Sequence, residues 1–241
     1  MKKIIFLHHS TGKNIWLGST NRYIYRLTKK SNVTDYFKNY NKKNKSDYFI
    51  EERNFPKLSP YGWNNYPYDY YNIWVKNAGN NPYKGEPTLE MLTKEYDVII
   101  FKHCYGVSRI VEDTGTPNIS SDVKSFENYK LQYEALKSKM HEFPSTMFII
   151  WTPAIYVKSQ ISEAEAKRTQ YFYKWMIDEW DDKGDNIFVW DFYEYETEGG
   201  LYMLDRNVDV PGNSHPGKDF SSRVSSLFSK FIIDAIEGRF M

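Results

Sequence analysis

The sequence has little cysteine, no long hydrophobic run and almost no net charge. Cys104 is the only cysteine among 241 residues, which excludes an intrachain disulfide and leaves too few thiolates for a thiolate-rich zinc site. We therefore expect a reducing compartment and a cytoplasmic protein. Two lysines and a few apolar residues precede His8, a stretch much shorter than a signal peptide or a membrane span.

The charges nearly cancel, with 32 Lys and Arg against 31 Asp and Glu. A formal charge of +1 is too weak to predict binding to nucleic acid or to an anionic membrane, so we expect a small partner that is not polyanionic. Neither of the glycine-rich patterns GxGxxG and GxxxxGK[ST] occurs, which disfavours nucleotide binding by those routes. What the chain does contain is aromatic residues, at 18%, which hints at recognition through surface rings.

Short apolar runs alternate with segments of helical periodicity. The runs that predict strands are residues 2–9, 47–54, 96–104, 146–154 and 186–192. A helix is predicted after Gly12, where Ile15, Trp16, Tyr23, Ile24 and Leu27 recur at roughly helical spacing. Further helices are predicted over 87–96, with Pro87 at its first position, and over 125–143, 162–180 and 218–237. Residues 28–46, rich in Lys and Asn, are predicted to be a solvated connection.

This alternation predicts a single α/β domain over residues 1–241, a three-layer α/β/α sandwich around a mainly parallel five-stranded sheet. With right-handed crossovers the expected strand order is 2-1-3-4-5. Ligands of such sheets bind outside the carboxyl ends of the strands. That rule directs attention to the segment HHSTG, residues 8–12, directly after the first strand.

Ser10 and His215 are the candidate catalytic pair. Ser10 follows the first strand, two residues before Gly12, at the start of a predicted helix whose N–H groups could stabilise an oxyanion. His215 lies in a Pro/Gly loop before the last helix and could take the serine proton, which a weak nucleophile needs. The structural alternative is that Ser10 or Thr11 only caps the helix.

On the pieces FLHHSTGKN and NSHPG, the sequence resembles the SGNH, or GDSL-like, hydrolase superfamily. The resemblance implies a flavodoxin-like fold, no cofactor and hydrolysis of esters, commonly acyl groups on sugars or lipids. It also implies Ser10 as the nucleophile and His215 as the general base.

Two parts of the family pattern are missing. The family's acid, three residues before the histidine, is Gly212 here, so Asp209 or a backbone carbonyl must orient His215. The family's Gly-x-Asn-Asp has no match in KHCYGVS. Candidate oxyanion or substrate-binding residues are Gly62, Asn64 and Ser108, and Trp63 in the aromatic segment 61–74 could line the site.

No metal site is predicted, because His8, His9, His103 and His215 have no ligand spacing such as HxH or HxxxH. We interpret Cys104 as a small core residue and Asp191 as a loop or cap residue. The leading functional hypothesis is a serine esterase or deacetylase acting on a small acyl ester, perhaps an O-acylated carbohydrate, through a Ser-His dyad or triad. The alternatives are an acyltransferase and a non-catalytic carbohydrate-binding protein on the same scaffold. Oligomeric state is left open.

Overall fold

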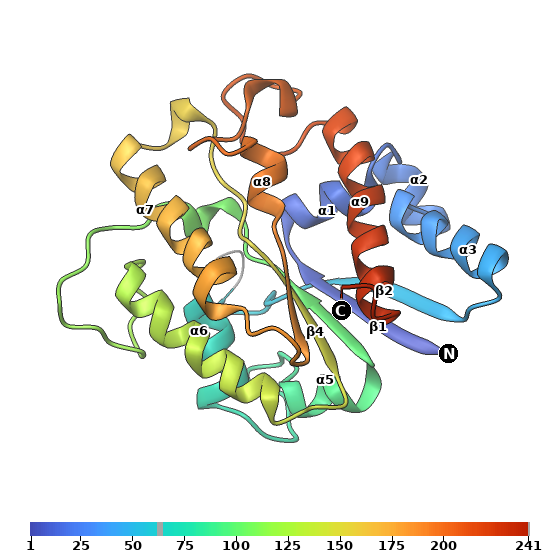
Figure 1. The fold of residues 1–241 in the computed structure, drawn as a ribbon, viewed down its shortest axis with the longest axis horizontal. Coiled ribbons are helices and arrows are strands. Elements are labelled where there is room, and N and C mark those ends of the chain that lie inside the picture. The colour runs from blue at the N-terminus through green and yellow to red at the C-terminus, as the bar shows by residue number, and fades with distance from the viewer. Residues whose placement is uncertain (62–64, 241) are drawn as a thin grey trace.

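A computed structural model describes residues 1–61 and 65–240. Five strands form one all-parallel sheet in the order β2-β1-β3-β4-β5 (Figure 1). The strands are β1 (Lys2–His8), β2 (Tyr48–Asn54), β3 (Val98–Phe101), β4 (Met147–Trp151) and β5 (Ile187–Trp190). The predicted α/β fold and strand order are therefore confirmed.

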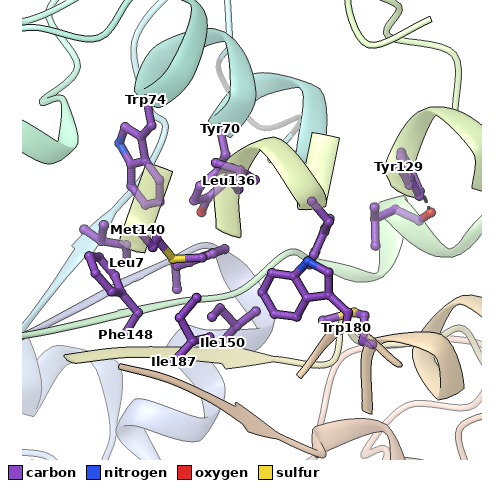
Figure 2. Close-up of a cluster of buried hydrophobic side chains, with 14 of the residues drawn as sticks. Leu7, Tyr70, Trp74, Tyr129, Leu136, Met140, Phe148, Ile150, Trp180 and Ile187 are labelled. Carbon is purple, nitrogen blue, oxygen red and sulfur yellow. Dashed lines mark hydrogen bonds between the residues drawn. The ribbon is translucent and has the colours of Figure 1, made fainter. Parts of the chain in front are cut away.

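The sheet is covered by helices on both faces because its strands are apolar on both. Along β1, Ile5 and Leu7 face one core while Ile4 and Phe6 face the other, as the two-residue period of a strand requires. The first core is closed by α4 (Pro67–Tyr71), α5 (Leu89–Glu95), α6 (Phe126–His141) and α7 (Glu163–Trp175). Figure 2 shows part of this core, where aromatic rings such as Trp74 and Trp180 fill the space above the sheet.

The second core is closed by α1 (Ser10–Leu17), α3 (Asn32–Asn44) and α9 (Lys218–Ile236). These helices come from opposite ends of the chain and lie side by side over the same face of the sheet (Figure 1). The packing of α9 against α1 brings the loop before α9 next to the start of α1.

The predicted helix after Gly12 is shorter than expected. α1 ends at Leu17, because Gly18 turns the chain with a φ of +58° and a Cβ there would collide with the Asn32 side chain. A separate helix, α2 (Arg22–Thr28), follows. The predicted helix is therefore two helices. Ile15 and Trp16 in the first are buried, whereas Tyr23, Ile24 and Leu27 in the second are exposed.

The prediction that residues 28–46 are only a connection was also wrong. They contain α3, which begins with a capping box between Ser31 and Thr34. Val33 and Phe37, four positions apart, are its buried residues and pack into the second core. Tyr36 and Tyr40, which are partly buried, pack against the same core, so the apolar face of α3 consists of residues 33, 36, 37 and 40. The Lys and Asn content masks this helical spacing.

The remaining elements are short. π-Helical turns extend α4 over Asn72–Lys76 and α7 over Met176–Trp180, and 3₁₀ turns cover Tyr105–Ser108, Lys158–Gln160 and Asp205–Asn207. α8 (Phe192–Thr197) follows β5, and Asp191 caps it, as predicted. Pro87 precedes the N-cap Thr88 of α5 rather than opening the helix. No helix within residues 1–61 and 65–240 combines the length and apolarity needed to cross a bilayer.

Candidate active site

Ser10 lies at the carboxyl edge of the sheet, where the strand order reverses. β1 pairs with β2 on one side and with β3 on the other, so the loop after β1 opens at the switch point where parallel α/β sheets bind ligands. Ser10 is the first residue of α1. Its hydroxyl oxygen lies 3.6 Å from the sulfur of Cys104, which follows β3. The serine is thus placed between the ends of β1 and β3.

Gly12 allows α1 to start directly against the end of β1. A Cβ on this residue would lie 2.6 Å from Cβ and 2.7 Å from Cγ of His8, closer than carbon atoms pack. The first turn of α1 therefore sits on the His8 side chain. The first N–H groups of a helix have no acceptor within it, and here they lie at the same edge as Ser10.

His215 comes from the loop before α9 and lines the same cavity as Ser10. An isolated antiparallel β-bridge between Val208 and Pro216 closes the loop. The Asn14 side chain of α1 donates a hydrogen bond to the Pro216 carbonyl (3.1 Å). The cavity, of about 590 Å³, lies between α1 and this loop. Both predicted catalytic residues therefore meet at one site, although no hydrogen bond within the described part of the chain joins their side chains.

The imidazole of His215 is held by Asn213. The Asn213 side-chain oxygen accepts the backbone N–H of His215 (3.0 Å) and lies 2.8 Å from its Nδ1. Because that oxygen can only accept, Nδ1 carries the proton and Nε2 is the basic atom of the ring. The Tyr105 hydroxyl lies 3.5 Å from both ring nitrogens, and its ring packs edge-on against the imidazole with centroids 5.0 Å apart.

The charge state of His215 suits a proton acceptor. Burial, followed by the positive charges of Lys102 and Arg22, lowers the pKa of His215 below its ordinary value of 6.5. The ring is therefore neutral at pH 7, which is the state that a general base requires.

Asp209, predicted as the partner of His215, is engaged elsewhere. Both oxygens of its carboxylate accept the backbone N–H of Lys218, the first residue of α9, at 3.1 and 3.0 Å. A negative charge at that place stabilises the N-terminal end of the helix dipole. Asp209 lines the cavity but caps α9, and Asn213 has the contact with Nδ1 that was predicted for Asp209. The sequence pattern favoured a carboxylate or a backbone carbonyl for this role and did not point to the Asn213 amide.

The predicted oxyanion and substrate-binding residues are only partly described. Ser108 is buried, and its hydroxyl donates to the Tyr105 carbonyl (2.6 Å) inside a 3₁₀ turn, away from the cavity that Ser10 lines. Gly62, Trp63 and Asn64 lie outside the described residues. The residue after them, Asn65, is buried, and its side-chain oxygen accepts the backbone N–H of Cys104 (2.8 Å). That bond ties the aromatic segment to the end of β3.

Two buried ionisable residues near the site were not anticipated. Lys102, at the end of β3, is fully buried, and its Nζ lies 3.5 Å from the sulfur of Cys104. Burial lowers the pKa of Lys102. Glu196 of α8 is also fully buried, with one oxygen accepting the Ile155 N–H (2.8 Å), and burial raises its pKa to about 8. The only sequence signal was a lysine directly after an apolar run.

The other buried histidines of this edge are structural. His8 Nε2 lies 2.9 Å from a carboxylate oxygen of Glu52, and His9 Nε2 lies 2.5 Å from the Pro56 carbonyl. Burial lowers the pKa of His9 to about 4 and that of His103 to about 3, so these rings are neutral at pH 7. Among the residues that the structure describes, no three His, Cys, Asp or Glu side chains are grouped to hold a metal ion.

Comparison with known proteins finds no family model that matches this chain and no curated protein with significant similarity to it. The chemistry of the site must therefore be inferred from the residues that line it.

Proposed function

We propose that the protein is a serine esterase or deacetylase of the SGNH type, which hydrolyses a small acyl ester. The observation that carries the proposal is that Ser10 and His215, 205 positions apart in the sequence, line one cavity at the switch point of a parallel sheet. The parallel sheet of order 2-1-3-4-5 agrees with the fold that the family resemblance implies. An O-acylated sugar is one candidate substrate, because the family resemblance implies acyl groups on sugars. The aromatic segment 61–74 does not add to this, since its rings Tyr61, Tyr70 and Trp74 are buried in the first core.

In the proposed reaction, the Ser10 hydroxyl oxygen attacks the ester carbonyl carbon while Nε2 of His215 takes its proton. The negative charge that develops on the carbonyl oxygen is stabilised by N–H groups of the first turn of α1, including that of Ser10. When the intermediate collapses, the C–O bond to the alcohol breaks and His215 returns the proton to the alcohol. An acyl-Ser10 ester remains.

The second half of the reaction repeats these steps with water. His215 takes a proton from water, the hydroxide attacks the acyl carbon, and the bond to Ser10 breaks as the serine regains its proton. Asn213 acts throughout as a positioning residue, since it keeps the proton on Nδ1 and leaves Nε2 to exchange protons. Asn is uncharged, so it stabilises the imidazolium less than a carboxylate would.

The test is turnover of p-nitrophenyl acetate together with labelling by a fluorophosphonate probe. We expect Ser10→Ala to abolish both, and His215→Ala to lower kcat/KM at least about a hundredfold, the low end of a general-base contribution. Ser138→Ala, which removes an exposed hydroxyl on α6, is the matched control and should leave both signals unchanged. Equal turnover by the wild type and Ser10→Ala would refute the proposal, and an inactive, unlabelled wild type would favour the carbohydrate-binding alternative.

A further inference from the structure

A second cavity beside Ser10 is lined mainly by basic side chains. It measures about 510 Å³ and shares Ser10 and Arg22 with the first cavity. Its lining consists of Ser10, Lys13, Arg22, Arg26, Glu52, Arg53, Asn54 and Lys57. Five of these residues are basic and one is acidic, although the whole chain has a formal charge of only +1. The positive charge is therefore concentrated at the candidate nucleophile.

The single acidic residue of this lining is already neutralised. Glu52 contacts His8 Nε2 (2.9 Å), accepts the Tyr25 hydroxyl (2.7 Å) and pairs with the Lys13 ammonium. Burial opposes its ionisation, but these hydrogen bonds hold the pKa of Glu52 well below its ordinary value. The carboxylate is thus ionised, and its charge is used to balance Lys13.

The other four cations have no acidic partner among the residues that the structure describes. Within the described part of the chain no ion pair involves Arg22, Arg26, Arg53 or Lys57, and all four are exposed. Arg22 donates to the neutral side chain of Asn14 (2.8 Å), and Arg53 donates to the Tyr96 hydroxyl (3.4 Å). These side chains come from α2 and from the end of β2, two segments that the fold brings to the same edge.

A buried lysine lies close to Ser10. Lys102 Nζ lies 3.5 Å from the sulfur of Cys104, which in turn lies 3.6 Å from the Ser10 hydroxyl oxygen. The positive charge of Arg22, which lines both cavities, also lowers the pKa of His215. Like charges gathered without counter-ions are unfavourable for the empty protein, and an anion would relieve that repulsion.

We propose that the ester substrate is an anion whose carboxylate or similar oxyanion group binds in the Arg22/Arg26/Arg53/Lys57 cavity while its carbonyl reaches Ser10. The inference rests on the proposed esterase function and specifies the substrate class. Arginine suits this role because its planar guanidinium donates two parallel hydrogen bonds to a carboxylate. A single exposed ion pair contributes little, so several unpaired cations at one place are what make selection by charge effective.

Two matched pairs of esters test this inference and identify the charged side. In the first pair the alcohol part differs in charge, 4-acetoxybenzoate against its methyl ester. In the second pair the acyl part differs, mono-4-nitrophenyl adipate against 4-nitrophenyl hexanoate. We expect the anionic member of at least one pair to have a kcat/KM about tenfold higher at low ionic strength, and this preference to shrink in about 0.5 M NaCl because salt screens exposed charges.

Substitutions locate the effect. Arg26→Gln should lower the anionic-to-neutral ratio of kcat/KM at least about threefold. Lys174→Gln, which removes an exposed cation on α7 far from both linings, should leave the ratio unchanged. Equal kcat/KM within both pairs, in an enzyme that hydrolyses them, would overturn the inference and leave the esterase proposal standing.

A binding measurement separates the two proposals if no ester is hydrolysed. Calorimetry on the Ser10→Ala variant compares 4-acetoxybenzoate with its methyl ester without turnover. Tighter binding of the anion, weakened by salt and by a second substitution Arg26→Gln, supports the anion site even if the protein is not an esterase. Binding of the two compounds with equal affinity overturns it.

Discussion

Nδ1 of His215 lies 2.8 Å from the side-chain oxygen of Asn213, a residue two positions earlier in the same loop. The acceptor is therefore local and neutral, rather than a carboxylate brought from a distance. Because the same oxygen accepts the His215 backbone N–H, the amide group is fixed in the orientation that presents oxygen to the ring. This contact defines the tautomer on which the proposed chemistry depends.

We expect Asn213→Ala to lower kcat for ester hydrolysis at least about tenfold, because His215 would lose the group that fixes its tautomer. Asp209→Ala should instead lower the free energy of unfolding by about 1 kcal/mol through loss of the α9 cap and leave kcat within about twofold. Steady-state kinetics and urea unfolding of both variants measure the contrast. The reverse pattern, with Asp209→Ala inactive and Asn213→Ala active, would make Asp209 the positioning residue.

The pH dependence of hydrolysis should reflect the lowered pKa of His215. The ring must be neutral to accept a proton, so kcat/KM falls as the pH drops through its pKa, and we expect that midpoint below 6.5. Arg22→Gln removes one of the positive charges that oppose protonation and should move the midpoint upward. Lys174→Gln, which removes an exposed cation on α7 that lines neither cavity, is the control. A midpoint above 6.5 in the wild type, or a downward shift in Arg22→Gln, would contradict this account.

Gly12→Ala should destabilise the protein by about 1–3 kcal/mol, because the added methyl group would lie 2.6 Å from Cβ of His8 and force α1 away from β1. Gly106→Ala provides the matched control. A Cβ there has its nearest neighbour, a ring carbon of Tyr66, at 3.7 Å, an ordinary packing distance. Urea unfolding measures the free energy of unfolding of the two variants. Equal values would show that the start of α1 can move away from His8 at little cost in stability.

Glu196 should make the protein less stable as the pH rises. Burial raises its pKa to about 8 from an ordinary value of 4.5, so between these values the folded state keeps a proton that the unfolded chain releases. The free energy of unfolding contributed by this group therefore decreases with pH across that window.

Glu196→Gln cannot ionise and should remove this decrease. We expect the variant to be more stable than the wild type at about pH 8 by at least about 1 kcal/mol, the equivalent of less than one pKa unit. Glu198→Gln, at the exposed end of α8, serves as control. Its hydrogen bond with Arg206 lowers the pKa of Glu198, whereas burial raises that of Glu196. Parallel stability curves for the wild type and Glu196→Gln would exclude a protonated Glu196.

The sequence by itself determined the layer architecture and the two residues proposed for catalysis. Apolar runs of strand length alternating with helical periodicity specify a parallel sheet, because each strand must be buried on both faces and each crossover needs a helix. Ser10 follows the first strand and His215 precedes the last helix. The order of elements in the chain sets where these two elements lie in such a fold, so both residues could be selected from the sequence.

Only the tertiary structure decided what surrounds that pair. Four features of the site depend on where distant segments of the chain meet. They are the burial of Lys102, the contact of Asn213 with the His215 ring, the capping of α9 by Asp209 and the cluster of four unpaired cations beside Ser10. Periodicity reports which face of one element is apolar, whereas a charged cavity arises when loops from several elements share an edge. The positive and negative charges of the chain nearly cancel, to a formal charge of +1. Only the folded arrangement gathers basic side chains into one cavity, apart from most of the acidic ones.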